Sequence, residues 1–236
     1  MSRENHSDSS TRKIMVVTGG SRGIGAAIVR EAARAGYNVA FTFHQSEDAA
    51  REVERQARET APESKIAAYK LDVRDAAAVE KWGERVLEEF GGVHVVVNNA
   101  GINRQNLAFS MTDDEWRDVL ETNLFGAFWV SRHFVPEMLA NKFGRFVFMG
   151  SIASDGSTGQ ANYAASKAGL EGLSGSLARE YGKRGVTSNV LQPGLIATDM
   201  VERDVAPEHL EMWKKICPAK RTGKPEEVAK LTLFLA

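Results

Sequence analysis

The sequence predicts an α/β protein in which helices cover both faces of one doubly wound parallel sheet. Six short β-rich runs alternate with longer helical patterns through short connections, and four of the runs are almost continuously apolar. A length of 236 residues, with 43% hydrophobic and 26% charged residues, is enough for one large globular domain. We therefore expect a single domain over residues 13–236 after a polar, disordered tail over residues 1–12.

The expected elements follow from these patterns in chain order. The strands are Ile14–Thr18, Asn38–Phe43, Lys65–Leu71, Val93–Asn98, Arg145–Gly150 and Thr187–Leu191. The helices are Ile24–Ala35, Glu47–Glu59, Ala76–Phe90, Asp114–Ala140, Asn162–Arg184 and Lys224–Ala236. The segment Thr112-Asp-Asp-Glu115 is a capping box at the start of the fourth helix. The last helix has neither a C-cap nor a following strand, which indicates a chain cut short.

Composition and charge indicate a soluble protein of a reducing compartment, which we expect to be the cytoplasm. The net charge of −1 gives no electrostatic case for binding nucleic acid or an anionic membrane. No apolar run approaches the roughly 20 residues that span a bilayer, and the N-terminus lacks the apolar core of a secretory signal. Cys217 is the only cysteine, so no internal disulfide can form. The five histidines lack the spacing of metal ligands, so we expect no metal.

A glycine-rich segment joins the first strand to the first helix and reads Val17-Thr-Gly-Gly-Ser-Arg-Gly-Ile-Gly25. In this context Gly19 permits a tight turn, Gly23 a close approach to a pyrophosphate, and Gly25 close packing of helix on strand. The helix N-terminus adds free N–H groups and a partial positive charge. The segment predicts the dinucleotide-binding loop of a Rossmann-type domain, with a plain glycine turn as the alternative.

The end of the second strand bears on the choice of nucleotide. An acidic residue there would bind the ribose 2′-hydroxyl of NAD, whereas this chain continues from Phe41 to Ser46 without a carboxylate. Arg22 in the glycine loop and His44 after the strand are placed to approach a 2′-phosphate. The sequence therefore favours NADP(H), and the alternative for Arg22 is a solvated loop cation.

Tyr163 and Lys167 are four residues apart, and Ser151 lies twelve residues before the tyrosine. Positions i and i+4 share one face of a helix, so the phenol and the ammonium can point into one cleft. A neighbouring cation lowers the pKa of a tyrosine from about 10, which would make the phenol a usable proton donor. Taken alone, a Tyr and a Lys at this spacing are usually only a surface pair on a helix.

Taken together, the motifs resemble those of the short-chain dehydrogenase/reductase family, and the resemblance runs from Lys13 to Ala236. The residues that carry it are Thr18-Gly19, Gly23-Ile-Gly25, Asn98-Asn-Ala-Gly101, Asn123, Ser151, Tyr163, Lys167 and Pro193-Gly194. Within that family the chain is most similar to the NADPH-dependent enzymes that reduce 3-oxoacyl thioesters on acyl carrier protein.

The resemblance implies four residues for the chemistry. Tyr163 would protonate the carbonyl oxygen of the substrate, and Ser151 would hydrogen-bond that oxygen. Lys167 would bind the ribose of the nicotinamide and lower the pKa of Tyr163, while Asn123 would hold a water that links Lys167 to solvent. Asn123 would also suit a polar kink in a packed helix.

The resemblance also implies a cofactor site at the carboxyl ends of the strands. Asp72 and Val73 would contact the adenine, although Asp72 would serve equally as a helix cap. The full set is Gly19, Ser21, Arg22, Gly23, Ile24, Gly25, His44, Asp72, Val73, Asn99, Ala100, Gly101, Tyr163, Lys167, Pro193, Gly194, Ile196 and Thr198.

The chain departs from the family pattern at three points. The interval from Ser151 to Tyr163 is one residue shorter than usual, with the deletion expected within residues 153–159 and Ser154 as a possible substitute for Ser151. Asn103 replaces a frequent threonine, and the seventh edge strand that usually takes part in a tetramer is missing. Lys142 and Arg184 match basic positions that meet acyl carrier protein in the similar reductases.

We expect this protein to reduce a 3-oxoacyl thioester with NADPH, as in fatty-acid biosynthesis, and to form a homotetramer or homodimer. The thioester would be carried on acyl carrier protein or coenzyme A. The alternatives within the family are reductases of acetoacetyl-CoA, of a polyketide, of a sugar or of a small alcohol. From another class, a non-catalytic regulator with a bound nucleotide remains open.

Overall fold

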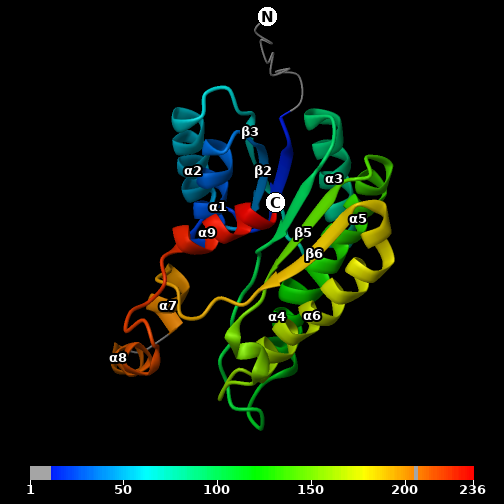
Figure 1. The fold of residues 1–236 in the computed structure, drawn as a ribbon. Coiled ribbons are helices and arrows are strands. Elements are labelled where there is room, and N and C mark those ends of the chain that lie inside the picture. The colour runs from blue at the N-terminus through cyan, green and yellow to red at the C-terminus, as the bar shows by residue number, and fades with distance from the viewer. Residues whose placement is uncertain (1–11, 205–206) are drawn as a thin grey trace, which may run out of the picture.

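Six parallel strands form one sheet in the order β3-β2-β1-β4-β5-β6 (Figure 1). A computed structural model of the chain describes residues 12–204 and 207–236. The strands are β1 (Ile14–Val17), β2 (Asn38–Phe43), β3 (Ile66–Lys70), β4 (Val95–Asn98), β5 (Gly144–Met149) and β6 (Val186–Leu191). The predicted α/β class and parallel sheet are confirmed, and the strand order reverses between β1 and β4, where such sheets bind ligands.

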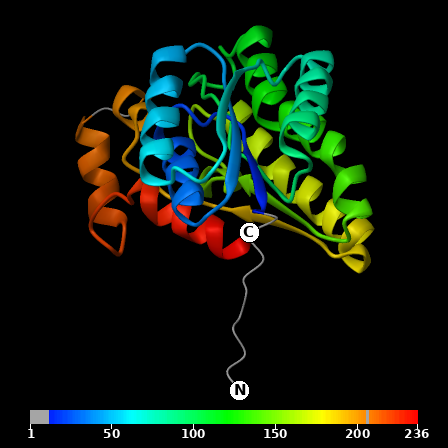
Figure 2. The ribbon, with the colours of Figure 1, turned by 90° about the horizontal axis from the view of Figure 1, so that it is seen from above.

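Helices cover both faces of the sheet (Figures 1 and 2). One layer holds α1 (Gly23–Arg34), α2 (Glu47–Thr60) and α9 (Pro225–Leu235). The other holds α3 (Ala76–Phe90), α4 (Asp113–Leu120), α5 (Gly126–Ala140) and α6 (Ala161–Tyr181). Alternate side chains of each strand enter the two cores, so that Met15 and Val17 face the first layer and Val16 the second.

The predicted long helix over Asp114–Ala140 is interrupted by a π-helical turn at Glu121–Phe125, between α4 and α5. A π-turn inserts an extra residue into a helix and is frequent at functional sites. Here the turn contains the buried Asn123. The capping box at the start of α4 is as predicted: Thr112 Oγ1 accepts a hydrogen bond from the Glu115 N–H at 3.1 Å, and the Glu115 carboxylate accepts one from the Thr112 N–H at 2.8 Å.

The segment after β6 forms two short helices, α7 (Asp199–Asp204) and α8 (Pro207–Ile216), which lie outside the two helical layers (Figure 1). The sequence predicted no helix in this segment. The predicted tail over residues 1–12 falls almost entirely outside the described residues. Over the part of the chain that the structure describes, no helix is long and apolar enough to cross a membrane.

Candidate active site

A cavity of about 660 Å³ opens along the carboxyl ends of the strands. Its lining includes every predicted cofactor residue, from the glycine loop at one end to Tyr163 and Lys167 at the other. Ser151 lines it as well, while Asn123 lies behind the wall next to Thr122. The structure therefore gathers into one site residues that are up to 179 positions apart, from Gly19 to Thr198.

Hydrogen bonds connect the glycine loop to the loop that follows β4. Thr18 Oγ1 accepts hydrogen bonds from the N–H groups of Asn99 and Ala100, both at 3.0 Å, and Asn99 Nδ2 donates to the carbonyls of Thr18 and Gly19. Gly19 has a φ of +66°, which glycine adopts without strain. At Gly25 a Cβ atom would stand 2.2 Å from the Gly19 carbonyl oxygen, so only glycine allows this packing.

Lys167 lines the cavity but is buried, with 4% of its surface exposed. Its Nζ donates a 2.6 Å hydrogen bond to the Met149 carbonyl at the end of β5 and lies 5.4 Å from the centre of the Tyr163 ring. Burial lowers the pKa of Lys167 to about 8. The predicted common face of Tyr163 and Lys167 on a helix is thus present, on α6.

Tyr163 and Ser151 both line the cavity, and the Ser151 hydroxyl is close enough to the Tyr163 phenol to act on its pKa as a hydrogen-bond partner. Burial raises the pKa of Tyr163 above its usual value, and the hydrogen bond from Ser151 offsets only part of that rise. The net shift is upward because the loss of water around the phenol outweighs the contribution from Ser151, and the expected lowering of this pKa by Lys167 stays a prediction.

The shortened interval before Tyr163 leaves Ser151 in the cavity wall. Ser151 caps the 3₁₀ turn Ile152–Asp155, where its Oγ accepts a hydrogen bond from the Ala153 N–H at 3.1 Å. Ser154 does not line the cavity and instead meets Gln192 Nε2 at 3.4 Å. Of the two serines, Ser151 is the one positioned beside Tyr163.

Asn123 connects three segments behind the cavity. Its Oδ1 accepts from the Ile102 N–H at 2.8 Å, and its Nδ2 donates to the Ile102 carbonyl and to Ser166 Oγ, each at 3.0 Å. Ser166 Oγ in turn donates to the Tyr163 carbonyl at 2.7 Å. The side chain thus ties the loop after β4 to the first turns of α6, and a water-holding role for Asn123 remains a prediction.

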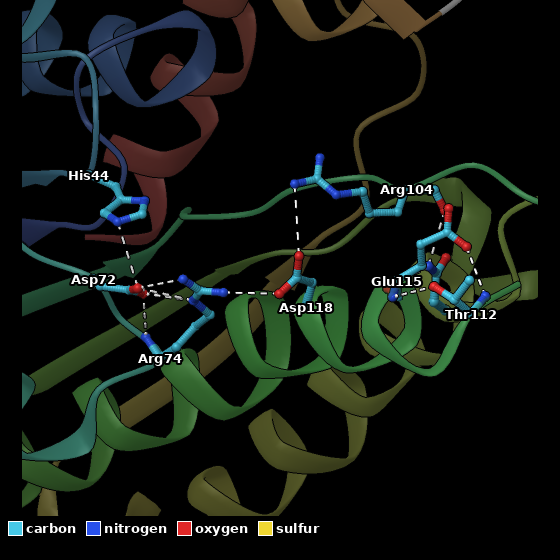
Figure 3. Close-up of polar contacts among 8 residues, drawn as sticks. His44, Asp72, Arg74, Arg104, Thr112, Glu115 and Asp118 are labelled. Atoms are coloured by element: carbon cyan, nitrogen blue, oxygen red, sulfur yellow. Dashed lines mark hydrogen bonds and ion pairs between the residues drawn. The ribbon is translucent and has the colours of Figure 1, made fainter.

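Arg74, Arg104 and Asp118, which the sequence analysis did not single out, also line the cavity and form ion pairs there (Figure 3). Arg74 binds Asp72, with Nη2 2.7 Å from Oδ2, and reaches Asp118 on α4 at 3.0 Å. Arg104 approaches the other oxygen of Asp118 at 3.9 Å, and His44 Nε2 lies 3.6 Å from Asp72. Hydrogen bonds from Arg74 hold the pKa of Asp72 below its usual value, so this carboxylate stays ionised.

Comparison with known proteins agrees with this geometry. Residues 13–209 match the family model described as short chain dehydrogenase. The chain belongs to the short-chain dehydrogenase family. It is 42% identical over 225 residues to the 3-oxoacyl-[acyl-carrier-protein] reductase FabG of Escherichia coli, covering 95% of this chain and 89% of that protein.

Further relatives of this short-chain dehydrogenase have the same name. The FabG reductases of Salmonella typhimurium and Haemophilus influenzae are 41% and 39% identical to it, covering 89% and 90% of those proteins and 95% of this chain. Among solved structures, levodione reductase superposes with a TM-score of 0.90 at 31% identity, covering 94% of this chain and 90% of that one. The protein is thus an oxidoreductase of a family that uses nicotinamide cofactors.

The cavity of this short-chain dehydrogenase fits such a cofactor. The first turn of α1 borders the cavity, and its N-cap residue, Arg22, makes no side-chain capping hydrogen bond. The N–H groups of that turn are therefore suited to a phosphate. The lining extends from His44 and Asp72, at the end expected to hold the adenosine, to Tyr163 and Lys167, at the end expected to hold the nicotinamide ribose.

Lys142 and Arg184 lie elsewhere. Each lies two residues before a strand, Lys142 before β5 and Arg184 before β6. They are therefore at the amino ends of the strands, whereas the cavity is at the carboxyl ends. Within one chain, these two cations do not border the site that holds Tyr163.

Proposed function

We propose that this protein reduces a 3-oxoacyl thioester to the 3-hydroxyacyl form with NADPH. The observation that carries the proposal is that Ser151, Tyr163 and Lys167 line one cavity, with Lys167 Nζ 5.4 Å from the centre of the Tyr163 ring. The names of the FabG relatives, at about 40% identity over nearly the whole chain, favour this substrate class over the others in the family.

In the proposed reaction, the bound nicotinamide supplies the hydride, and the chain supplies position and protons. Ser151 donates a hydrogen bond to the substrate carbonyl oxygen and so orients it toward Tyr163. The phenol of Tyr163, kept protonated by its raised pKa, gives its proton to that oxygen as the negative charge develops. The ammonium of Lys167 then stabilises the phenolate, because a neighbouring cation favours an anion in a buried site.

NADPH is proposed over NADH because basic side chains line the end of the cavity expected to hold the adenosine. Arg22 and His44 line it, and Arg74 holds the Asp72 carboxylate in an ion pair. With Asp72 engaged in this way, its charge opposes a 2′-phosphate less. No carboxylate occupies the position after β2 that would select the 2′-hydroxyl of NAD.

The test is the rate of NADPH oxidation with acetoacetyl-CoA, with a 3-oxoacyl carrier protein, and with a panel of simple ketones and sugars. We expect kcat/KM for the thioesters to exceed that for the simple ketones by at least about tenfold, and NADPH to be preferred over NADH. NADPH binding without turnover of any carbonyl would favour the non-catalytic regulator instead. Turnover of ketones or sugars alone would assign the protein to another substrate class.

We also propose a homo-oligomer that forms through α4 and α5. Trp116, Phe125 and Phe128, on α4, the π-turn and α5, are 39%, 45% and 38% exposed, and the Arg132 guanidinium stacks on Phe128 and Trp129. Large exposed apolar stripes mark interfaces. Phe128→Glu should shift the mass measured by light scattering toward the monomer, and an unchanged oligomer would contradict this interface.

A further inference from the structure

The side chain of Asn162, directly before Tyr163, is completely buried. Its Nδ2 donates to the carbonyls of Arg104 and Glu115, each at 3.0 Å, and its Oδ1 accepts from the Tyr163 N–H at 2.7 Å. One amide group therefore joins the loop after β4, the first turn of α4 and the first turn of α6. Both of its donor hydrogens are used, as a buried amide requires.

The loop that Asn162 holds forms part of the cavity wall, because Ile102 and Arg104 line the same cavity as Tyr163. Two other contacts hold the same loop. Asn123 binds both backbone groups of Ile102, and Asn106 forms a parallel bridge with Gln160, through its N–H and the Gly159 carbonyl at 2.9 Å. Asn162 holds Arg104, the residue between these two contacts.

We propose that Asn162 is a positioning residue, which clamps residues 102–106 against the first turn of α6 and so fixes Tyr163 relative to the wall that faces the substrate. This inference rests on the proposed function. Asn162 does not line the cavity and acts through Arg104 and Tyr163. Proton transfer requires hydrogen-bond distance between phenol and carbonyl oxygen, and a misplacement of about 1 Å costs about 100-fold in rate.

The geometry suggests two variants with different chemistry. Asn162→Ala removes all three hydrogen bonds. Asn162→Asp keeps the size and the acceptor for the Tyr163 N–H, but it turns a carboxylate oxygen toward the carbonyls of Arg104 and Glu115. Both variants should lower kcat/KM for the carbonyl substrate by about 10- to 100-fold, while the dissociation constant of NADPH changes by less than about twofold.

Ser174→Ala is the matched control on the same helix. Ser174 is 4% exposed, and its Oγ is 2.7 Å from Ser188 Oγ, far from the cavity lining. Its loss should reduce thermal stability and leave kcat and KM within about twofold. A general loosening of α6 would affect all three variants alike, whereas a clamp next to Tyr163 affects activity only in the Asn162 variants.

Two measurements distinguish a positioning role of Asn162 from a general loss of stability. Hydrogen exchange of residues 102–112 should be faster in Asn162→Ala than in the wild type and unchanged in Ser174→Ala. Since burial raises the pKa of Tyr163, a loosened loop should admit water and move the alkaline limb of the kcat profile to lower pH. The expected result is both changes, together with the loss of kcat/KM.

Folded Asn162 variants with wild-type kcat, KM and loop exchange would overturn the inference, and so would an equal loss of activity in Ser174→Ala. If the proposed function is wrong, the result is different, because the wild-type protein itself then reduces no carbonyl substrate. Hydrogen exchange requires no turnover, and exchange of residues 102–112 that is the same in the wild type and Asn162→Ala would overturn the clamp in that case also.

Discussion

The ammonium of Lys167 donates its hydrogen bond to the carbonyl oxygen of Met149, 2.6 Å away, where β5 ends beneath the candidate active site. No carboxylate is hydrogen-bonded to this buried cation among the described residues, and its burial alone lowers its pKa to about 8. The fold thus keeps a poorly solvated positive charge next to Tyr163, which is expensive for stability and suited to stabilising a phenolate.

The energetic cost of burying the charged Lys167 side chain should make the stability of the protein depend on pH. The folded pKa of Lys167 is about 8 and the unfolded value about 10.5, so between these pH values the unfolded chain binds more protons. Stability should therefore rise with pH across this window, by up to roughly 3 kcal/mol from this group. Urea unfolding at pH 7 and pH 9.5 measures the rise.

Lys167→Met is the control for that measurement, because it removes the titrating group and leaves the other groups in place. The difference in unfolding free energy between wild type and variant should increase with pH, and a constant difference would contradict the assignment. The variant should also lose carbonyl reduction, by about 100-fold or more in kcat, since the phenolate loses its neighbouring charge.

Ser151 should matter for turnover and Ser154 should not. Ser151→Ala removes the hydroxyl beside the Tyr163 phenol, so kcat should fall by about 100-fold, as for other donors that stabilise an oxyanion. Ser154→Ala changes a serine outside the cavity lining and should stay within about twofold. Steady-state kinetics of both variants with the same thioester measures the two effects. A larger loss of kcat in Ser154→Ala than in Ser151→Ala would assign the binding of the carbonyl oxygen to Ser154.

Preference for NADPH should depend on Arg22. Arg22→Ala should raise the KM for NADPH by about 10-fold or more, because the 2′-phosphate loses a charge-assisted contact, and should change the KM for NADH little. Arg30→Ala, on α1 but outside the cavity lining, provides the matched control. An equal effect of Arg22→Ala on both cofactors would indicate a contact with the pyrophosphate instead.

Acid stability should depend on His94. Its Nδ1 accepts a hydrogen bond from the Ile14 N–H at 3.1 Å, which requires a neutral ring. Burial, and then the nearby Lys13, lower the pKa of His94, while Glu137 opposes them. Because the folded pKa lies below the unfolded value of 6.5, stability from this group is complete above about pH 6.5 and decreases as the pH falls toward the folded value.

His94→Asn separates this contribution from those of other groups, because Asn Oδ1 can replace the acceptor without titrating. Thermal melts between about pH 7 and 5 measure the stability of both proteins. As the pH falls, the wild type should lose more stability than the variant. His133, whose pKa is also lowered by burial, remains in both proteins and cancels in the comparison. A difference that does not vary with pH would contradict the role of His94.

The parts of this fold that were predicted correctly depend on local pattern. The β-rich runs placed all six strands within two residues at each end, and four of these runs are almost continuously apolar, as expected for strands covered on both faces. The capping box at Thr112 was predicted correctly for a similar reason, since both of its partners lie within four residues.

Features that depend on distant neighbours were missed. The π-turn around Asn123 leaves no signature in the helical pattern of residues 114–140. Arg74 directly follows Asp72 and Val73 and could have been considered, but its contact with Asp118 joins residues 44 positions apart. Asn162 was predicted only as the first residue of a helix, because nothing local shows that its amide meets Arg104 and Glu115.

By itself, the sequence determined the sheet, the glycine loop, and the pairing of Tyr163 with Lys167 on one helix, since these follow from spacing along the chain. The tertiary structure decided how those groups behave. Burial raises the pKa of Tyr163 and lowers that of Lys167, two shifts that the spacing of the pair along the helix does not predict. Protonation in a buried site depends on how much water the surrounding segments exclude, and only their packing in three dimensions determines that.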